Sequence, residues 1–334
     1  MRFFLPFAAL AALFLAWWAL ARRGPESLVV YCSHDAIHAE KILRDFEKRS
    51  GIPVAIRYDT EATKSLGLIE LLVREKDAPR CDVFWSNELL GMSDLAHREI
   101  LLSYKGPGWA RMPERFRDPD GAWTGFAARM RVVIYNPQRV TASQISERPA
   151  GELSRFAMAK PLYGTTLTHY TVLWQTLGAD GLKAWHKESR ARGLLELNGN
   201  AAVKDAVAEG VCDLGFTDTD DFFDARDDGK TVAVEPVRLA DKRTIVIPNT
   251  VAIIRGTRRE NEGRRLVDFL LSEETELALS RSKSRQIPLG PVPPDQLPAE
   301  VRELAEWTKD GIDLRPLSPA RAACLEWLKL EYLR

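Results

Sequence analysis

The sequence predicts an α/β protein with two lobes, joined by two extended crossovers around a ligand cleft. Three observations support this prediction. The chain has 334 residues, more than a single hydrophobic core usually holds. Short apolar segments alternate with segments whose apolar residues recur at helical spacing, which is typical of parallel strands connected by helices. Two long extended segments, residues 127–136 and 244–254, are suited to passing between lobes.

Residues 1–24 are interpreted as a targeting segment, because an uncharged apolar run of 18 residues follows shortly after Arg2. The Ala19-Leu20-Ala21 triplet favours a cleaved signal peptide. Arg22 and Arg23 directly after the run favour an uncleaved membrane anchor. Both interpretations place residues 25–334 in the periplasm or otherwise outside the cytoplasm, with membrane contact through the N-terminal segment if it is uncleaved.

The composition is that of an ordinary globular protein, with 45% apolar and 28% charged residues. Basic and acidic residues are equal in number, 47 of each, so the basic excess of a nucleic-acid-binding protein is missing. The four cysteines are widely spaced and match no paired metal-ligand pattern, so we expect free thiols; they are Cys32, Cys81, Cys212 and Cys324.

The first lobe is expected to open with strand, loop and helix units. Its strands are predicted at residues 27–31, 54–58 and 82–85. In parallel sheets, ligands bind beyond the carboxyl ends of the strands. The loops after these strands are therefore expected to meet at the cleft; they are residues 32–35, 59–62 and 86–88.

A stretch rich in Pro, Gly and charge, residues 107–123, precedes the first crossover and marks a change of lobe. The second lobe is predicted to contain helices at residues 172–177, 182–193 and 201–209 and a strand at 213–217. Lobe 1 is accordingly assigned to residues 25–128 and 250–334, and lobe 2 to residues 129–249. The amphipathic C-terminal helices can extend over both lobes.

Five segments occur in an ordered set: LVVYCSHD, DVFW, RMRVVIYN, EGVCDLGFTDTDD and IPNTVAII. In this order they resemble family 1 extracellular solute-binding proteins of ABC importers, and in particular their ferric-iron-binding periplasmic branch. The resemblance covers roughly residues 27–320. It implies a type II periplasmic-binding-protein fold, which closes on its ligand like a hinged trap and delivers it to a membrane permease with its ATPase subunit.

The resemblance also implies where the ligand binds, and this chain departs from the family pattern there. Asp220 and Asp221 stand where the ferric-binding relatives have two consecutive tyrosines. Asn87 stands where relatives have a glutamate, and Glu88 follows it. His34 is a neighbour-shifted counterpart of the relatives' histidine. Iron binding is therefore implied by the family, with changed chemistry at the site.

Basic and hydroxyl side chains are also expected at the cleft. Arg129 and Arg131 correspond to the paired arginines with which relatives hold a companion anion, and their alternation on an extended segment points both the same way. They can equally neutralise acidic loops across the cleft. Thr165 and Thr166 precede a helix, where their hydroxyls can hold an oxyanion or cap the helix.

Acidic side chains gather on the predicted loops after strands, and oxygen ligands suit hard cations such as iron, manganese, magnesium and calcium. The metal ligands proposed from the sequence are His34, Glu88, Asp220 and Asp221. The full set of ligand-binding candidates is Ser33, His34, Asp59, Glu61, Asn87, Glu88, Arg129, Arg131, Thr165, Thr166, Asp220 and Asp221.

Other interpretations of these residues remain open. Aspartates at positions 218, 220 and 221 can cap a helix that begins near Phe222, and Asp59 or Thr60 can cap the helix that follows. Carboxylates also suit an organic amine, with Trp85 and Tyr170 as aromatic faces for a cation–π contact.

Catalysis is not expected, because the sequence contains no GxSxG, HExxH, P-loop or GxGxxG motif in a suitable context. No catalytic residue and no cofactor are assigned, apart from a metal cation bound as the transported ligand. The expected partners are the permease, its ATPase subunit and the small ligand, and the protein is expected to be a monomer. Two alternatives use the same fold: a binding protein for an organic amine or anion, and a membrane-tethered sensor or adaptor.

Overall fold

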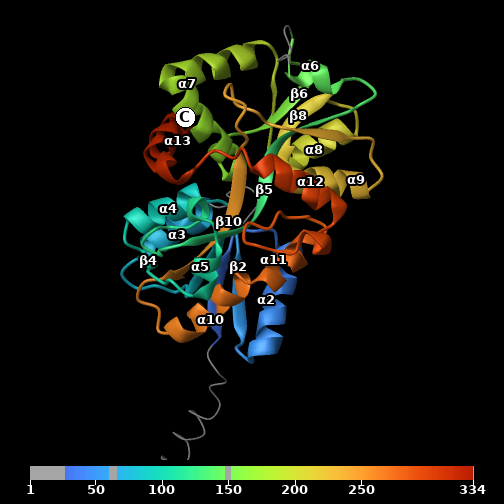
Figure 1. Cartoon of the computed structure of the whole chain (residues 1–334). Helices are drawn as coiled ribbons and strands as arrows, with labels where there is room; N and C mark the ends of the chain where they lie inside the picture. Colours follow the sequence, from blue (N-terminus) through green and yellow to red (C-terminus); the bar gives the residue numbers. More distant parts are fainter. Residues whose placement is uncertain (1–26, 60–65, 147–151, 334) are drawn as a thin grey trace, which may run out of the picture.

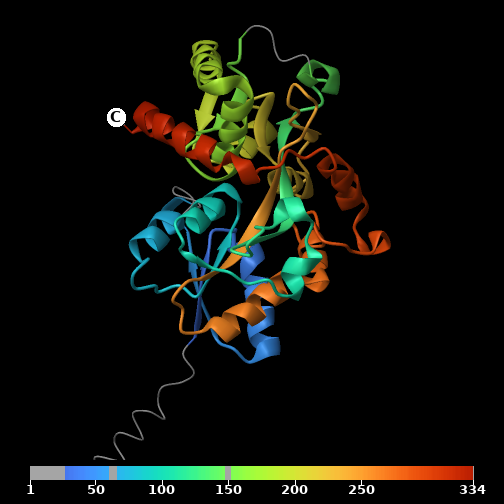
Figure 2. The ribbon, with the colours of Figure 1, turned by 60° about the vertical axis from the view of Figure 1, so that its left-hand side comes forward.

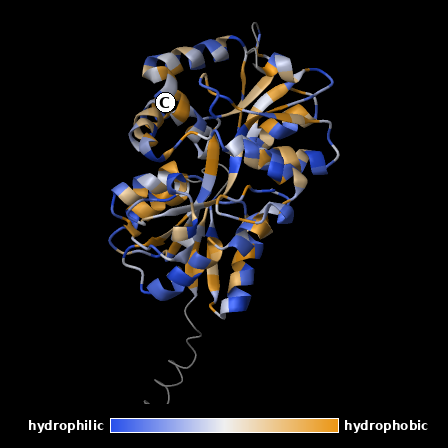
Figure 3. Cartoon of the chain, viewed as in Figure 1, coloured by the Kyte–Doolittle hydropathy of each residue, from blue (hydrophilic) through white to orange (hydrophobic). Residues whose placement is uncertain are grey.

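The computed structural model describes residues 27–59, 66–146 and 152–333, and these form two lobes joined by long strands (Figure 1). The strands follow the order β2-β1-β3-β10-β5-β8-β6-β7, with β4 beside β10 and β9 beside β5. Figure 3 shows apolar residues along the central strands and polar residues on the outward helix faces. This is the mixed α/β, type II periplasmic-binding-protein architecture that the sequence predicts.

The first lobe contains the three parallel strands predicted from the sequence, β1 (Leu28–Cys32), β2 (Val54–Tyr58) and β3 (Val83–Ser86). Helix α2 (Ala36–Ser50) packs on this sheet because its buried residues recur at helical spacing, and it ends at Gly51 in the left-handed conformation. The other elements here are α3 (Leu66–Arg74), α4 (Leu90–His97), β4 (Leu101–Leu102), α5 (Pro107–Arg111) and a 3-10 helix at Glu114–Phe116.

The crossovers are β5 (Thr124–Tyr135) and β10 (Val246–Ile254), which pair antiparallel. Every residue of both strands is buried, and this explains their long apolar runs. Their register shifts between Pro248 and Asn249, where Ala127 adopts a φ of 40° and its carbonyl accepts a hydrogen bond from Asn249 Nδ2. This irregular point lies where the strands pass between the lobes, as a hinge requires.

The second lobe contains β6 (Phe156–Ala159), β7 (Leu195–Leu197), β8 (Leu214–Asp218) and β9 (Ala233–Pro236). Its helices are α6 (Ala142–Ser146), α7 (Gly164–Ala191), α8 (Asn200–Ala208) and α9 (Thr219–Asp227). The two helices predicted at 172–177 and 182–193 are parts of α7, which begins eight residues earlier than predicted and is kinked at Gly178, whose φ is 75°.

The C-terminal region contributes α10 (Glu260–Leu270), α11 (Glu273–Ser280), α12 (Ala299–Thr308) and α13 (Ser318–Tyr332), with 3-10 helices at Pro294–Gln296 and Arg315–Leu317. Helix α12 packs on the second lobe through Leu304. Helix α13 contacts both α7 and α4, so it lies between the lobes (Figure 2). The residue boundaries proposed for the lobes stay a prediction.

All four cysteines are buried free thiols, as the sequence predicts. Within residues 27–59, 66–146 and 152–333, no helix has both the length and the hydropathy needed to cross a membrane. The targeting segment predicted at residues 1–24 lies outside the described residues.

Candidate functional site

A cleft of about 840 Å³ lies at the ends of strands from both lobes. This volume falls within the range of about 300–1,000 Å³ that is usual for small-molecule sites. The first lobe contributes Asn87 and the start of α2, including Asp35 and His38. The second lobe contributes the starts of α7, α8 and α9, and the end of α13 adds Tyr332 and Leu333.

Three helices of the second lobe begin at the cleft, where strands β6, β7 and β8 end. Gly164 and Gly199 have φ values of 53° and 124°, and both sit at the entry to a helix, α7 and α8 respectively. The chain can turn sharply from strand to helix there because glycine tolerates positive φ. The N-termini of three helices therefore lie along this wall of the cleft, with first-turn backbone N–H groups that have no partner within their own helix.

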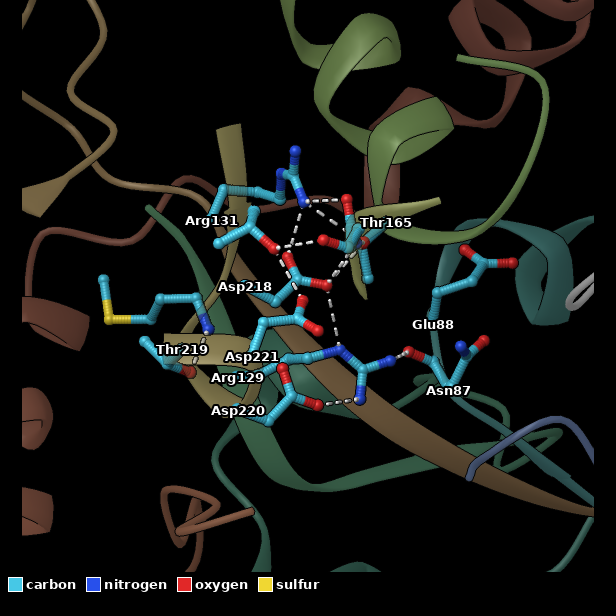
Figure 4. Close-up of polar contacts among 12 residues, drawn as sticks. Asn87, Glu88, Arg129, Arg131, Thr165, Asp218, Thr219, Asp220 and Asp221 are labelled. Atoms are coloured by element: carbon cyan, nitrogen blue, oxygen red, sulfur yellow. Dashed lines mark hydrogen bonds and ion pairs between the residues drawn. The ribbon is translucent and has the colours of Figure 1, made fainter. Parts of the chain in front are cut away.

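Arg131 and Asp218 form a buried ion pair on neighbouring strands, with 2.7 Å between Arg131 Nη1 and Asp218 Oδ1 (Figure 4). The other carboxylate oxygen of Asp218 accepts hydrogen bonds from Thr165 Oγ1 at 2.6 Å and from Asn200 Nδ2 at 2.9 Å. The group ties β5, α7, α8 and β8 together. Asp218 makes no side-chain cap bond to α9, although it stands at the N-cap position.

Arg129 bridges the two lobes across the cleft (Figure 4). Its Nη2 donates a hydrogen bond of 2.8 Å to the backbone oxygen of Asn87. On the other side, its Nε lies 3.5 Å from Asp218 Oδ2 and its Nη1 lies 3.7 Å from Asp220 Oδ2. The side chain is only 3% exposed, so this guanidinium is held in a fixed position between first-lobe backbone and second-lobe carboxylates.

Asp218, Asp220 and Asp221 form an acidic turn, in which one oxygen atom from each residue lies within 4.8 Å of those of the others. Asp220 and Asp221 belong to the first turn of α9, and both line the cleft. Asp221 Oδ2 accepts a hydrogen bond of 2.6 Å from Thr217 Oγ1. The N-terminus of α9 carries a partial positive charge from the helix dipole, which favours carboxylates at this position.

The acidic turn and its surroundings raise the pKa of Arg129. Burial alone would lower the pKa, but the carboxylates of Asp220 and Asp218 outweigh it, with smaller contributions from Asp35 and Asp221. Asp35 belongs to the opposite wall, so the guanidinium experiences carboxylates from both lobes. Among the residues lining the cleft, aspartates outnumber arginines and lysines. The site therefore favours a cation or a ligand with a positively charged group.

Comparison with known proteins places this fold and site in a family. The model of the family described as "Bacterial extracellular solute-binding protein" matches residues 28–282. The chain belongs to this family. Its members bind solutes, as the sequence resemblance implies. The solute-binding protein is also 26% identical over 217 residues to the Fe(3+)-binding periplasmic protein of Serratia marcescens, which covers 63% of this chain and 62% of that protein.

Two further comparisons agree. This solute-binding protein is 24% identical over 251 residues to Iron uptake protein A1 of Synechocystis, covering 71% of this chain and 67% of that protein. Iron-bound HitA from Pseudomonas aeruginosa has the same fold, with a TM-score of 0.79 at 20% identity over 91% of this chain and 99% of that one. The resemblance to the ferric-iron-binding branch is thus confirmed.

The structure brings half of the sequence-predicted set to the cleft of this solute-binding protein. The lining residues from that set are Asn87, Arg129, Thr165, Thr166, Asp220 and Asp221. Arg131 lies behind them as the partner of Asp218. Glu61 lies outside the described residues. Thr165 holds Asp218 rather than capping a helix, so its role in the cleft is to organise the acidic turn.

His34 and Ser33 do not line the cleft. His34 is buried, its Nε2 lies 3.0 Å from Gln286 Nε2, and its ring stacks on Trp85 with 5.5 Å between centroids. Ser33 Oγ accepts a hydrogen bond of 3.1 Å from the Asn87 backbone N–H. The loop after β1 therefore holds the loop after β3 in place, while its next residue, Asp35, reaches the cleft.

Glu88 and Asp59 bond to helix backbones instead of lining the cleft. Glu88 accepts hydrogen bonds from the backbone N–H groups of Leu90 at 2.6 Å and Gly91 at 2.7 Å, at the start of α4. Asp59 Oδ2 accepts one from Leu68 in the first turn of α3 at 3.3 Å. The four metal ligands predicted from the sequence are therefore not assembled, since His34 and Glu88 lie outside the cleft.

The prediction that Trp85 and Tyr170 offer aromatic faces to a ligand is wrong, because both side chains are fully buried in the hydrophobic cores. Tyr163 and Tyr332 line the cleft in their place. Tyr163 precedes the glycine that opens α7, so a strand-to-helix turn could have indicated it. Tyr332 comes from the end of the chain, and no local pattern reveals that α13 returns to the cleft.

Proposed function

We propose that this chain is the extracytoplasmic substrate-binding component of an ABC importer, and that its cleft captures iron(III) for delivery to a membrane permease and its ATPase subunit. The relatives support the proposal, because two that match in sequence are named for iron binding or iron uptake. In this role the protein is periplasmic and monomeric and catalyses no reaction, and the metal is its cargo. Residues 1–24 either direct its export or anchor it to the inner membrane.

The acidic turn is the observation that carries the proposal. Asp220 and Asp221 face the cleft with oxygen atoms close enough to bind one ion, and Asp35 stands on the opposite wall. A hard trivalent cation prefers oxygen ligands, which these carboxylates supply. Arg129 offsets the repulsion among them while the cleft is empty.

Arg129 also provides a place for an anion that accompanies the metal. Within the described part of the chain, its Nε and Nη1 make no hydrogen bond and contact the carboxylates only at the longer distances given above. A buried guanidinium with open N–H groups gains a charge-assisted hydrogen bond when a carboxylate or phosphate oxygen arrives. The metal and its anion would together balance the charges of the acidic turn and Arg129.

Lobe closure follows from the arrangement of these groups. The ligand contacts Asp220 and Asp221 on one lobe and Asp35 on the other, so its binding free energy favours the conformation in which the two walls are close. The irregular pairing of β5 with β10 near Ala127 and Asn249 lets the lobes rotate without breaking either core. The permease would recognise the closed form and release the ligand by opening it.

The test is a thermal-shift and calorimetric screen of the metal-stripped protein against iron(III) citrate, iron(II), other divalent metals, amines, and phosphorylated or carboxylated solutes. A specific ligand at 100 times its Kd stabilises the folded state by about 2.7 kcal/mol. We expect this response from iron(III), and its loss in Asp220→Asn with Asp221→Asn. Asp224→Asn is the matched control, because Asp224 lines the same cleft but pairs with Lys204. Stabilisation by an organic solute without any metal response would refute the proposal.

A further inference from the structure

A second cavity, of about 970 Å³, lies in the second lobe between the sheet and α7. Its walls are largely apolar and come from β5, β6, β8, α7, the loop after α7, β9 with the loop that follows it, and residues 312–317; they include Val133, Phe156, Leu173, Leu194, Leu214 and Phe216. Its volume is of the size that small-molecule sites usually have, about 300–1,000 Å³. None of its lining residues belongs to the cleft.

The cavity and the cleft share one face of the sheet. Arg131 pairs in register with Asp218 at the cleft end, and the next pair on the same face, Val133 with Phe216, lines the cavity. Helix α7 contributes residues to both sites. It presents Thr165 to the cleft, and one turn later His169 to the cavity.

His169 lines the cavity and has one unsatisfied polar atom. The residue is only 2% exposed, its ring stands edge-on to Phe216 with 5.0 Å between centroids, and its Nδ1 has no hydrogen-bond partner among the described residues. Burial first, and the Arg131 guanidinium second, hold the pKa of His169 well below its ordinary value of 6.5. A neutral imidazole with an open nitrogen is costly in an apolar wall unless something hydrogen-bonds to it.

The rim of the cavity carries no net charge. Arg192, Arg238 and Arg243 are matched there by Glu235, Asp241 and Asp313. Arg243 is already paired with Asp241 at 2.6 Å, and Asp313 with Arg315 at 2.7 Å. The lining therefore offers a large apolar surface, neutral polar side chains at His169, Gln175, Thr176 and Ser189, and no excess charge that would attract an ion.

We propose that this cavity is a second binding site, for a neutral and mostly apolar small molecule with a single hydrogen-bonding group that reaches His169, such as an aromatic alcohol. Apolar walls provide most of the affinity by removing the ligand's surface from water. The one polar contact fixes its orientation and satisfies the open nitrogen. This proposal does not depend on what the cleft binds, so it is tested independently of the proposed function.

Calorimetric titration of the full chain with 2-naphthol tests the proposal, with 2-naphthalenesulfonate as the charged probe of the same shape. We expect one 2-naphthol per chain and much weaker binding of the sulfonate. Leu173→Trp should weaken binding by narrowing the cavity from α7. Leu330→Trp is the matched control, because it adds the same indole at an exposed site on α13, where Leu330 is 53% exposed.

His169→Phe separates the polar contact from the apolar walls. Loss of one hydrogen bond should weaken 2-naphthol binding about fivefold, and His169→Gln should restore part of it. Circular dichroism melts establish that each variant is folded before it is titrated. The proposal is overturned if the wild-type protein binds no 2-naphthol at a one-to-one ratio, if Leu173→Trp binds it unchanged, or if the sulfonate binds equally well.

Discussion

The two walls of the cleft use their polar side chains differently. Behind the first-lobe wall, Glu88 bonds to the start of α4 and His34 to Gln286, so neither side chain faces the cleft. On the second-lobe wall, Asp220 and Asp221 project from the first turn of α9 into the cleft. Position after a strand therefore does not by itself identify a ligand contact, because the side chain can instead form hydrogen bonds with the following helix or a neighbouring loop.

The second-lobe wall is also the one that contains a buried ion pair. Asp218 stands two and three residues before Asp220 and Asp221, and its bonds to Arg131, Thr165 and Asn200 fix the start of α9. The first-lobe wall depends on neutral contacts such as Ser33 with Asn87. We therefore expect the two walls to respond differently to substitution, with the largest losses on the second-lobe side.

Asp218→Ala should have the largest effect. It leaves the Arg131 guanidinium, which is 0% exposed, without its carboxylate, and breaking a buried pair in this way costs about 3–5 kcal/mol of unfolding free energy. Chemical denaturation measures the loss. Asp220→Ala is the matched control, and it should cost less than Asp218→Ala, because its contact with Arg129 is longer, at 3.7 Å, and because its removal relieves repulsion with Asp218 and Asp221. Equal losses in the two variants would contradict the distinction between a structural and a ligand-facing aspartate.

Arg129→Lys should have the next largest effect, on binding rather than stability. Lysine keeps the charge but cannot reach Asn87 O and the acidic turn at once, because it lacks the forked guanidinium. Loss of one hydrogen bond to a charged group lowers ligand affinity by about ten- to a hundredfold. Calorimetry with the ligand found in the screen measures this. An unchanged affinity would show that Arg129 does not link the walls in the bound form.

The sequence predicts the frame of this molecule well, because strands buried on both faces read as continuous apolar runs. The first-lobe strands, β8 and both crossovers begin and end within three residues of their predicted positions. Helix α7 was predicted too short because four threonines among its buried residues, between positions 165 and 171, are weak helix formers. Tertiary packing of this buried segment overrides that local preference.

The site was harder to predict, for a physical reason. Arg129 and Arg131 alternate on β5 and both contact Asp218, and Asp220 and Asp221, which follow β8, line the cleft; their roles as ligand contacts stay a prediction. Side-chain direction in loops has no comparable periodicity. Glu88 lies two residues after the end of β3 and two before the start of α4, so its position in the sequence fits a ligand contact and a helix cap equally. Only the distances to Leu90 and Gly91 decide between them.

Glu88→Gln should have the smallest effect on binding and tests that decision. Glutamine keeps one acceptor oxygen for the start of α4 but leaves the backbone N–H of Leu90 or Gly91 without its acceptor, so the cost should be about 1–3 kcal/mol. Ligand affinity should not change, unlike in Asp221→Asn. Burial raises the pKa of Glu88 above 4.5, opposed chiefly by Arg321. The folded state therefore holds this proton more tightly than the unfolded state, and the wild-type protein loses stability as the pH rises above 4.5 toward the folded pKa. Glutamine removes this loss, so the cost of the substitution should shrink from acidic to neutral pH in denaturation curves. A stability cost that grows with pH would contradict the raised pKa of Glu88. A loss of ligand affinity would show that Glu88 contacts the ligand.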